Sequence, residues 1–188
     1  MACFERGNLA PVTTDNVNHI LLADDQEHDA FFLRRAIKSA GLQIQLHAVQ
    51  DGEQAVDYLC GSNLYADRLR HPLPCLLVTD IKMPRFDGFE LLAWLQTRRE
   101  FASLPKLVMS SSCHEGDLKR CLDLGATAFF TKPSEPEQLV AMVGEWHRDW
   151  LVAHCSRGAL SALPSAQPAT ALASLVTRLL SPPRKARV

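Results

Sequence analysis

Apolar and polar residues alternate along this chain with two periods, one typical of strands and one typical of helices. Short apolar runs at residues 20–23, 75–79, 106–109 and 128–131 predict buried strands. Residues 45–49 carry a more mixed pattern and predict a more exposed strand.

Helical patterns fill the intervals between these strands. Three intervals have apolar residues at i, i+3 and i+4, and two more are also predicted to be helical. The five helices are expected near residues 33–40, 52–59, 88–97, 118–122 and 139–150. Gly41 and Gly125 follow two of these patterns, as glycine often follows a helix, and Pro136 stands at a first-turn position of the last. Strands that alternate with helices predict an α/β fold: a doubly wound, five-stranded parallel sheet with helices on both faces.

Composition divides the chain into three parts. Residues 1–17 are polar and non-periodic and predict a flexible segment, and residues 18–152 form the predicted domain. Residues 153–188 are rich in Ala, Ser and Pro, with a short amphipathic helix expected near 170–180. This tail contains five Arg and Lys residues and no acid, so its charge is +5. Because the net charge of the whole chain is −1, residues 1–152 carry a charge of −6.

The overall composition excludes several classes of protein. A chain of 188 residues with 47% apolar and 22% charged residues suits one globular domain and excludes collagen-like, disulfide-scaffold and wholly disordered chains. No apolar run reaches the roughly 18 residues of a membrane span, and the N-terminus lacks a signal-peptide pattern, so we expect a cytoplasmic protein. The acidic domain argues against direct nucleic-acid binding. The six cysteines include no C-x-x-C pair, and the seven histidines show no paired metal spacing, so we assign neither a role in chemistry.

Polar side chains stand where the predicted strands end. Asp24 and Asp25 follow the first strand, Asp80 the third, Ser110 the fourth and Lys132 the fifth. The carboxyl ends of parallel strands meet at one edge of the sheet, so these residues are expected together. Three clustered carboxylates repel one another unless a cation such as Mg²⁺ joins them, and Mg²⁺ leaves positions for phosphate oxygens. The pattern favours phosphoryl transfer to Asp80, with Lys132 as the cationic side chain.

These motifs resemble a known family. The acidic pair at 24–25, the run TDIKMPRFDG at 79–88, Ser110-Ser111 and Lys132-Pro133 are together similar to the receiver domain of two-component response regulators, over residues 18–152. The lengthened stretch at 61–74 and the ending at 146–151 look like the stand-alone receivers associated with bacterial phytochromes.

The resemblance implies a flavodoxin-like receiver fold with strand order 2-1-3-4-5 and a role for each site residue. Asp80 would be the phosphoacceptor, and the Mg²⁺ ligands would be Asp24 (through a water), Asp25, Asp80 and the backbone carbonyl of Lys82. Lys132 and Ser110 would contact the phosphoryl oxygens.

The resemblance also assigns residues around the site. Phe129 stands at the aromatic switch position, with Ser110 as the switch hydroxyl, and Pro133 is expected to follow a cis peptide. Ser111 and Lys82 depart from the usual residues that flank the phosphoryl group, which puts the lifetime of the phosphorylated state in doubt. Taken alone, Asp24 and Asp25 would be interpreted as a helix cap. The serines at 110–112 would, taken alone, also be interpreted as helix-capping residues.

The function implied is that of a single-domain response regulator. It would accept a phosphoryl group from a sensor histidine kinase, of the phytochrome type by the narrower resemblance, and switch its binding to an unidentified downstream protein. It would not be an enzyme in the usual sense, although it would catalyse its own Mg²⁺-dependent phosphorylation and dephosphorylation.

Other readings stay open at this point. The alternative is a phosphorylation-independent adaptor with the same fold, for which a damaged acidic cluster would be the signal. An aspartate-nucleophile phosphatase is disfavoured, because Lys82 stands where a second acid would be needed. The fourth helix, fifth strand and fifth helix could form a homodimer contact through Trp146 and Trp150, with burial of Trp146 in the core as the competing interpretation.

Overall fold

Five parallel strands form one sheet, in a computed structural model that describes residues 18–112 and 114–152. The strand order is β2-β1-β3-β4-β5. The strands are β1 (Asn18–Ala23), β2 (Ile44–Val49), β3 (Leu76–Thr79), β4 (Lys106–Ser110) and β5 (Ala128–Thr131). This order confirms the predicted doubly wound sheet, and all five predicted strands are present within one or two residues of their expected ends.

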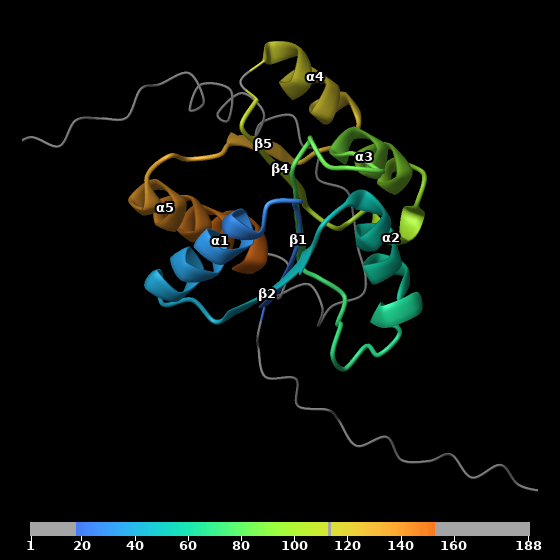
Figure 1. Ribbon diagram of the computed structural model, residues 1–188, viewed down its shortest axis with the longest axis horizontal. Helices are drawn as coiled ribbons and strands as arrows, with labels where there is room; N and C mark the ends of the chain where they lie inside the picture. Colours follow the sequence, from blue (N-terminus) through green and yellow to red (C-terminus); the bar gives the residue numbers. More distant parts are fainter. Residues whose placement is uncertain (1–17, 113, 153–188) are drawn as a thin grey trace, which may run out of the picture. The chain divides into compact units, whose positions relative to one another are not determined.

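Helices cover the sheet on both faces, as predicted (Figure 1). They are α1 (Glu27–Ser39), α2 (Gly52–Cys60), α3 (Gly88–Gln96), α4 (Glu115–Asp123) and α5 (Pro136–Trp146), with short turns η1 (Asn63–Tyr65) and η2 (Arg99–Phe101) and a π-helical turn η3 (His147–Leu151). Helix α1 packs beside α5, whereas α3 contacts both α2 and α4. The two groups of helices shield the apolar sheet from water on opposite sides.

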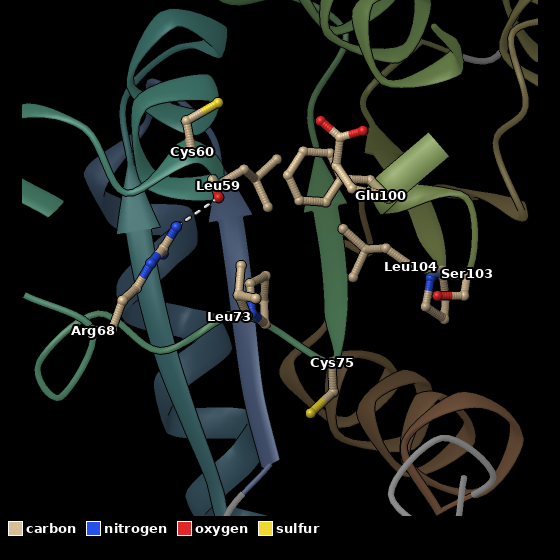
Figure 2. A pocket seen from close by; sticks show the side chains of 11 residues that line it. Leu59, Cys60, Arg68, Leu73, Cys75, Glu100, Ser103 and Leu104 are labelled. Carbon is tan, nitrogen blue, oxygen red and sulfur yellow. Dashed lines mark hydrogen bonds between the residues drawn. The ribbon is translucent and has the colours of Figure 1, made fainter. Parts of the chain in front are cut away.

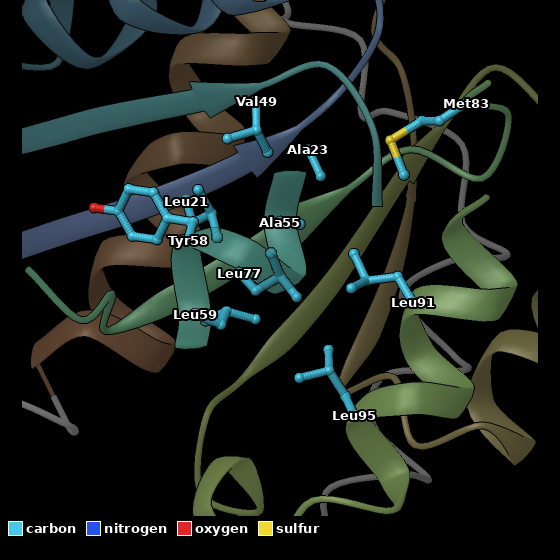
Figure 3. Packing of buried hydrophobic residues seen from close by; sticks show 10 residues of the cluster. All are labelled: Leu21, Ala23, Val49, Ala55, Tyr58, Leu59, Leu77, Met83, Leu91 and Leu95. Atoms are coloured by element: carbon cyan, nitrogen blue, oxygen red, sulfur yellow. The ribbon is translucent and has the colours of Figure 1, made fainter. Parts of the chain in front are cut away.

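One core cluster lies between the sheet and α2 and α3 (Figure 3). Leu21 of β1 and Leu77 of β3 are fully buried against Leu59 of α2 and Leu91 of α3. Each such leucine contributes roughly 1.5–3 kcal/mol through burial of its apolar surface. This packing fixes the ends of β1 and β3, from which the acidic residues follow.

A second core cluster joins β4 and β5 to α3 and α4. Phe129, at the expected aromatic switch position, is 7% exposed and packs with Ile81, Val108 and Cys121. At the far side of β5, the ring of Phe130 lies 5.8 Å from that of Trp146, which is fully buried. Of the two interpretations of Trp146, the structure therefore supports the core residue.

Residues 61–74 form an ordered connection from α2 to β3. Gly61 ends α2 with φ +68°, and a Cβ there would lie 2.7 Å from the Arg68 guanidinium. Arg68 donates hydrogen bonds to the carbonyl oxygens of Tyr58 at 2.8 Å and of Leu59 at 2.7 Å, and the second of these is drawn in Figure 2. These bonds close the helix end. A cavity of about 600 Å³ opens beside Arg68 and Leu73, at the amino ends of β3 and β4.

Several expectations concern residues outside the described ranges. The N-terminal segment 1–17 and the tail 153–188, with its predicted helix near 170–180, lie outside them. Within residues 18–112 and 114–152, no helix is long and apolar enough to span a bilayer. The three cysteines in this part, Cys60, Cys75 and Cys121, are free thiols.

Candidate functional site

Three carboxylates meet at the carboxyl edge of the sheet, where the sequence placed them. Asp24, Asp25 and Asp80 each offer an oxygen atom, and these oxygens lie within 4.8 Å of one another. Strands β1 and β3 are neighbours that pair Ala23 with Thr79, and the Asp80 amide donates to the Ala23 carbonyl at 2.9 Å. Asp24 and Asp80 are buried, whereas Asp25 is half-buried.

Backbone amides hold one oxygen of each buried acid. The Ile81 amide donates to Asp80 Oδ1 at 2.6 Å, and the Gln26 amide donates to Asp24 Oδ1 at 3.0 Å. The second oxygen of each carboxylate faces Lys132. The backbone therefore fixes both acids and leaves one oxygen on each for a cation.

Gly88 allows the loop after Asp80 to fold back over the end of β3. A Cβ at Gly88 would lie 2.1 Å from the Asp80 carbonyl oxygen, and its amide donates to the Ile81 carbonyl at 2.9 Å. Any side chain here would push the loop away from the strand end. The DG pair at 87–88 is thus needed for the shape of the site.

The same loop is tied to α2 by two residues for which the sequence analysis predicts no role. Arg85, with φ +63°, pairs its guanidinium with the carboxylate of Asp51, which is fully buried. Asp51 also caps α2 by accepting from the Gln54 amide at 2.8 Å. The Gly52 amide donates to the Phe86 carbonyl at 3.0 Å, so the loop and α2 hold each other in place.

Lys132 is surrounded by carboxylates. Its Nζ lies 2.6 Å from Asp29 Oδ2, 2.8 Å from Asp24 Oδ2 and 2.9 Å from Asp80 Oδ2. The Asp29 and Asp80 contacts are hydrogen bonds, whereas Asp24 Oδ2 makes a close ionic contact without hydrogen-bond geometry. Burial favours the neutral amine, but the contacts with the three acids outweigh it and raise the pKa of Lys132. Burial raises the pKa of Asp24, against the attraction of Lys132.

Asp29 is the site residue that sequence reasoning missed. It lies in the first turn of α1, four residues after Asp25, and makes the shortest of the three contacts with Lys132. An acid in a first turn is usually read as a partner of the helix dipole. The only signal available was its place on the helix that follows the acidic pair, and a lysine 103 positions away gives no hint of contact.

The other predicted residues flank this centre in different ways. Ser110 ends β4, is fully buried, and its Oγ accepts from the Ser112 amide at 3.3 Å. Ser112 in turn lies 2.5 Å from Asp117 of α4. The side chains of Lys82 and Ser111 are exposed. The serine run therefore links the end of β4 to the start of α4.

The expectation of a cis peptide before Pro133 is wrong. No cis peptide bond occurs among the described residues, so the Lys132–Pro133 bond is trans. The trans form is the more stable one for most X–Pro bonds. The end of β5 places Lys132 without it, because the Lys132 amide donates to the Ser110 carbonyl at 2.9 Å.

The acids of this site fit a divalent metal ion. Carboxylate oxygens are the ligands that Mg²⁺ and Mn²⁺ prefer, and Asp24 and Asp80 each direct one oxygen toward Lys132. From the described residues, the buried Asp24 Oδ2 accepts no hydrogen bond. A second cation at this edge would relieve the repulsion that the single lysine charge leaves uncompensated.

The sheet order and the acidic edge together define a doubly wound signalling domain of the receiver class. The family of response regulator receiver domains matches residues 20–144. The chain belongs to this family, which is a signalling module of two-component systems.

Response regulators of light signalling are among the most similar solved structures. One, from red light signalling in R. palustris, is 27% identical with a TM-score of 0.68 and covers 80% of this chain and 100% of its own. The phosphorylated cyanobacterial phytochrome response regulator RcpA is 27% identical, with a TM-score of 0.66 over 79% of this chain and 99% of its own.

A third relative carries a metal. Rcp1 of Synechocystis is 26% identical over 132 residues, 70% of this chain and 88% of its own. Its Mn²⁺-bound structure has a TM-score of 0.63 at 25% identity, over 79% of this chain and 99% of its own. Divalent metal binding is a property of the family, and the acidic trio described above fits it.

Proposed function

We propose that this protein is a phosphorylation-dependent, single-domain response regulator in which Asp80 accepts a phosphoryl group from a histidine kinase. The observation that carries the proposal is the contact of Lys132 Nζ with Asp80 Oδ2 at 2.9 Å, inside a trio of acids at the sheet edge. The damaged acidic cluster that would favour a phosphorylation-independent adaptor is not found among the described residues.

The chemistry assigns one task to each group. An Asp80 oxygen forms the new bond to phosphorus as the N–P bond of the donor phosphohistidine breaks, and the departing imidazole takes up a proton. A bound Mg²⁺ would neutralise charge on the phosphoryl oxygens. Lys132 then exchanges its contact with the Asp80 carboxylate for one with a phosphoryl oxygen, and the buried Ser110 hydroxyl lies at the neighbouring strand end to donate to another.

Asp29 holds Lys132 in place during this exchange. When the metal and the phosphoryl group engage Asp24 and Asp80, Asp29 remains as a carboxylate partner of Nζ, at 2.6 Å. It is therefore a positioning residue for Lys132, and its own contact does not involve the reacting oxygen.

The signal passes from the site to the α4 side of the domain. Ile81, whose amide binds Asp80 Oδ1, packs in the same cluster as Phe129 and Cys121 of α4. Phe129 has no hydroxyl group and can respond to the site only through packing. Such coupling requires that this cluster have two arrangements of similar free energy, since proximity alone transmits nothing.

Mass spectrometry after incubation with acetyl phosphate and Mg²⁺ tests the proposal. We expect one phosphoryl group on the wild type and on Asp149→Asn, an exposed acid chosen as the matched control. Asp80→Asn, shown folded by circular dichroism, should gain none. Equal phosphorylation of Asp80→Asn would contradict the assignment, and transfer from a phosphorylated histidine kinase then tests the physiological donor.

We further propose a homodimer through α4, β5 and α5. Strand β5 is an edge of the sheet, and Phe130 and Trp150 are partly exposed beside it. Sedimentation analysis with and without a phosphoryl mimic should show association that Trp150→Lys weakens. A monomer at all concentrations would refute the dimer.

The domain is proposed to end near residue 152. Leu151 is fully buried, whereas Val152 is 50% exposed. Deletion of residues 156–188 should leave the thermal unfolding midpoint and the phosphorylation of Asp80 unchanged. Loss of either would show that the basic tail belongs to the domain.

A further inference from the structure

Two histidines meet on the α2 side of the sheet, toward its amino end. His19 belongs to β1 and His47 to β2, where His47 pairs with Leu21, two residues beyond His19 on the same face. His19 Nδ1 lies 3.2 Å from His47 Nε2, and the ring centres are 5.4 Å apart. The pair is created by the strand register, across 28 positions of sequence.

A third imidazole approaches from residues 61–74. The ring centre of His71 lies 6.4 Å from that of His47 and packs edge-on against Tyr58 and Tyr65. The Tyr58 hydroxyl donates to the Pro72 carbonyl at 2.9 Å, which holds this segment over the pair. All three histidines are partly exposed, so solvent reaches the cluster.

The imidazoles of His19 and His47 are uncharged at neutral pH. Burial lowers the pKa of His19, and burial, followed by the charges of His19, His71 and Arg34, lowers the pKa of His47 to about 4. A neutral imidazole keeps a nitrogen lone pair that can bind a metal ion. Metal binding at neutral pH would therefore not require either ring to lose a proton first.

We propose that His19 and His47 chelate a borderline transition-metal ion, Zn²⁺ being the ion that best suits the pair. Two nitrogens bound to a tetrahedral zinc at about 2.0–2.1 Å lie about 3.3 Å apart, close to the distance in this structure. Imidazole is a preferred ligand of Zn²⁺ and a poor one for Mg²⁺.

His19 and His47 supply two ligands of the proposed zinc ion, and the remaining ligands must come from nearby groups or water. Among the described residues, only Asp24, Asp25 and Asp80 bring three donor groups to one point, so His71 must rotate or water must complete the zinc site. A site completed by His71 would join β1 and β2 to residues 61–74. The competing explanation of the 3.2 Å contact is an N–H···N hydrogen bond between neutral rings.

Calorimetric titration of the full, untagged chain with Zn²⁺ in excess Mg²⁺ tests the proposal. Wild type and His114→Gln, an exposed histidine as matched control, should share one binding event. His19→Gln and His47→Gln should weaken that event at least about tenfold, because the chelate is lost. Zinc held by acids or thiols elsewhere would appear equally in every variant.

Two further measurements keep the test decisive. Nitrogen-15 NMR should show Zn²⁺-dependent shifts at His19 Nδ1 and His47 Nε2. Circular dichroism shows whether each variant folds; if His47→Gln does not, the partly exposed His19 carries the test alone. Unchanged zinc affinity in a folded His19→Gln variant would overturn the proposal and leave the pair as a hydrogen bond.

Discussion

The two ends of the sheet differ in the chemistry that they gather. The carboxyl end holds the acids Asp24, Asp25 and Asp80 with Lys132, and the amino-terminal half of β1 holds His19, whose ring contacts His47 of β2. His19 and Asp24 are five residues apart on one extended strand, so about 16 Å separates them. The short β1 strand thus separates hard oxygen ligands from imidazole nitrogens.

The difference teaches how each end acquires its residues. At the carboxyl end, each strand leads directly into the loop that starts a helix, so consecutive strand ends bring distant acids together. At the amino end, the contact arises between side chains within two strands and depends on their register, Leu21 with His47. The first arrangement follows from topology alone, and the second does not.

The largest expected effect is a loss of Mg²⁺ binding at the carboxyl end without a loss of Zn²⁺ binding at the histidine pair. Asp25→Ala should weaken Mg²⁺ binding at least about tenfold, because a carboxylate ligand is lost, and should leave zinc binding at His19 and His47 unchanged. Calorimetry with each ion measures both. Equal Mg²⁺ affinity in wild type and Asp25→Ala would contradict the acidic metal site.

Removal of the lysine charge should act in the opposite direction. Lys132→Met leaves Asp24 and Asp80 without their shared cation, so Mg²⁺ should bind at least as tightly and up to about tenfold more tightly. The same titration reports the change. Weaker Mg²⁺ binding in a folded Lys132→Met variant would show that the lysine supports the metal instead of competing with it.

Asp29 should have a smaller effect, confined to the phosphorylation reaction. Asp29→Asn removes one charged partner of Lys132 and should raise the KM for acetyl phosphate by about two- to fivefold, as expected for one ion pair. Glu27→Gln, an acid in the same helical turn, is the matched control. An unchanged KM with a lowered kcat would reject the positioning role.

Sequence reasoning succeeded where function depends on strand ends. The apolar runs located β1, β3, β4 and β5, and the polar residues that follow them are Asp24, Asp80, Ser110 and Lys132. The chain's alternation of strands and helices was enough to place these side chains at one edge. Their proposed roles in phosphoryl transfer still await the experiments above.

Sequence reasoning failed where a contact depends on strand register or on a side chain that reaches from one element to another. The histidines have no metal spacing in the sequence, yet His19 and His47 lie 3.2 Å apart. Asp29 and Lys132 meet across 103 positions of sequence, and the peptide before Pro133 is trans despite the family expectation. Pairwise geometry of this kind is set by tertiary packing, which periodicity does not encode.

The smallest expected effect concerns acid stability at the amino end, measured with EDTA present. His47 has a pKa of about 4 in the folded chain, below its ordinary 6.5, so the unfolded chain binds a proton first as pH falls. Its contribution to stability is complete above pH 6.5 and is lost as pH falls toward 4. Between pH 7 and pH 5, the urea midpoint of His47→Gln should fall by about 0.5 M less than that of wild type. His114→Gln should behave as wild type, and an equal loss in all three proteins would show that His47 is not protected from protonation by the fold.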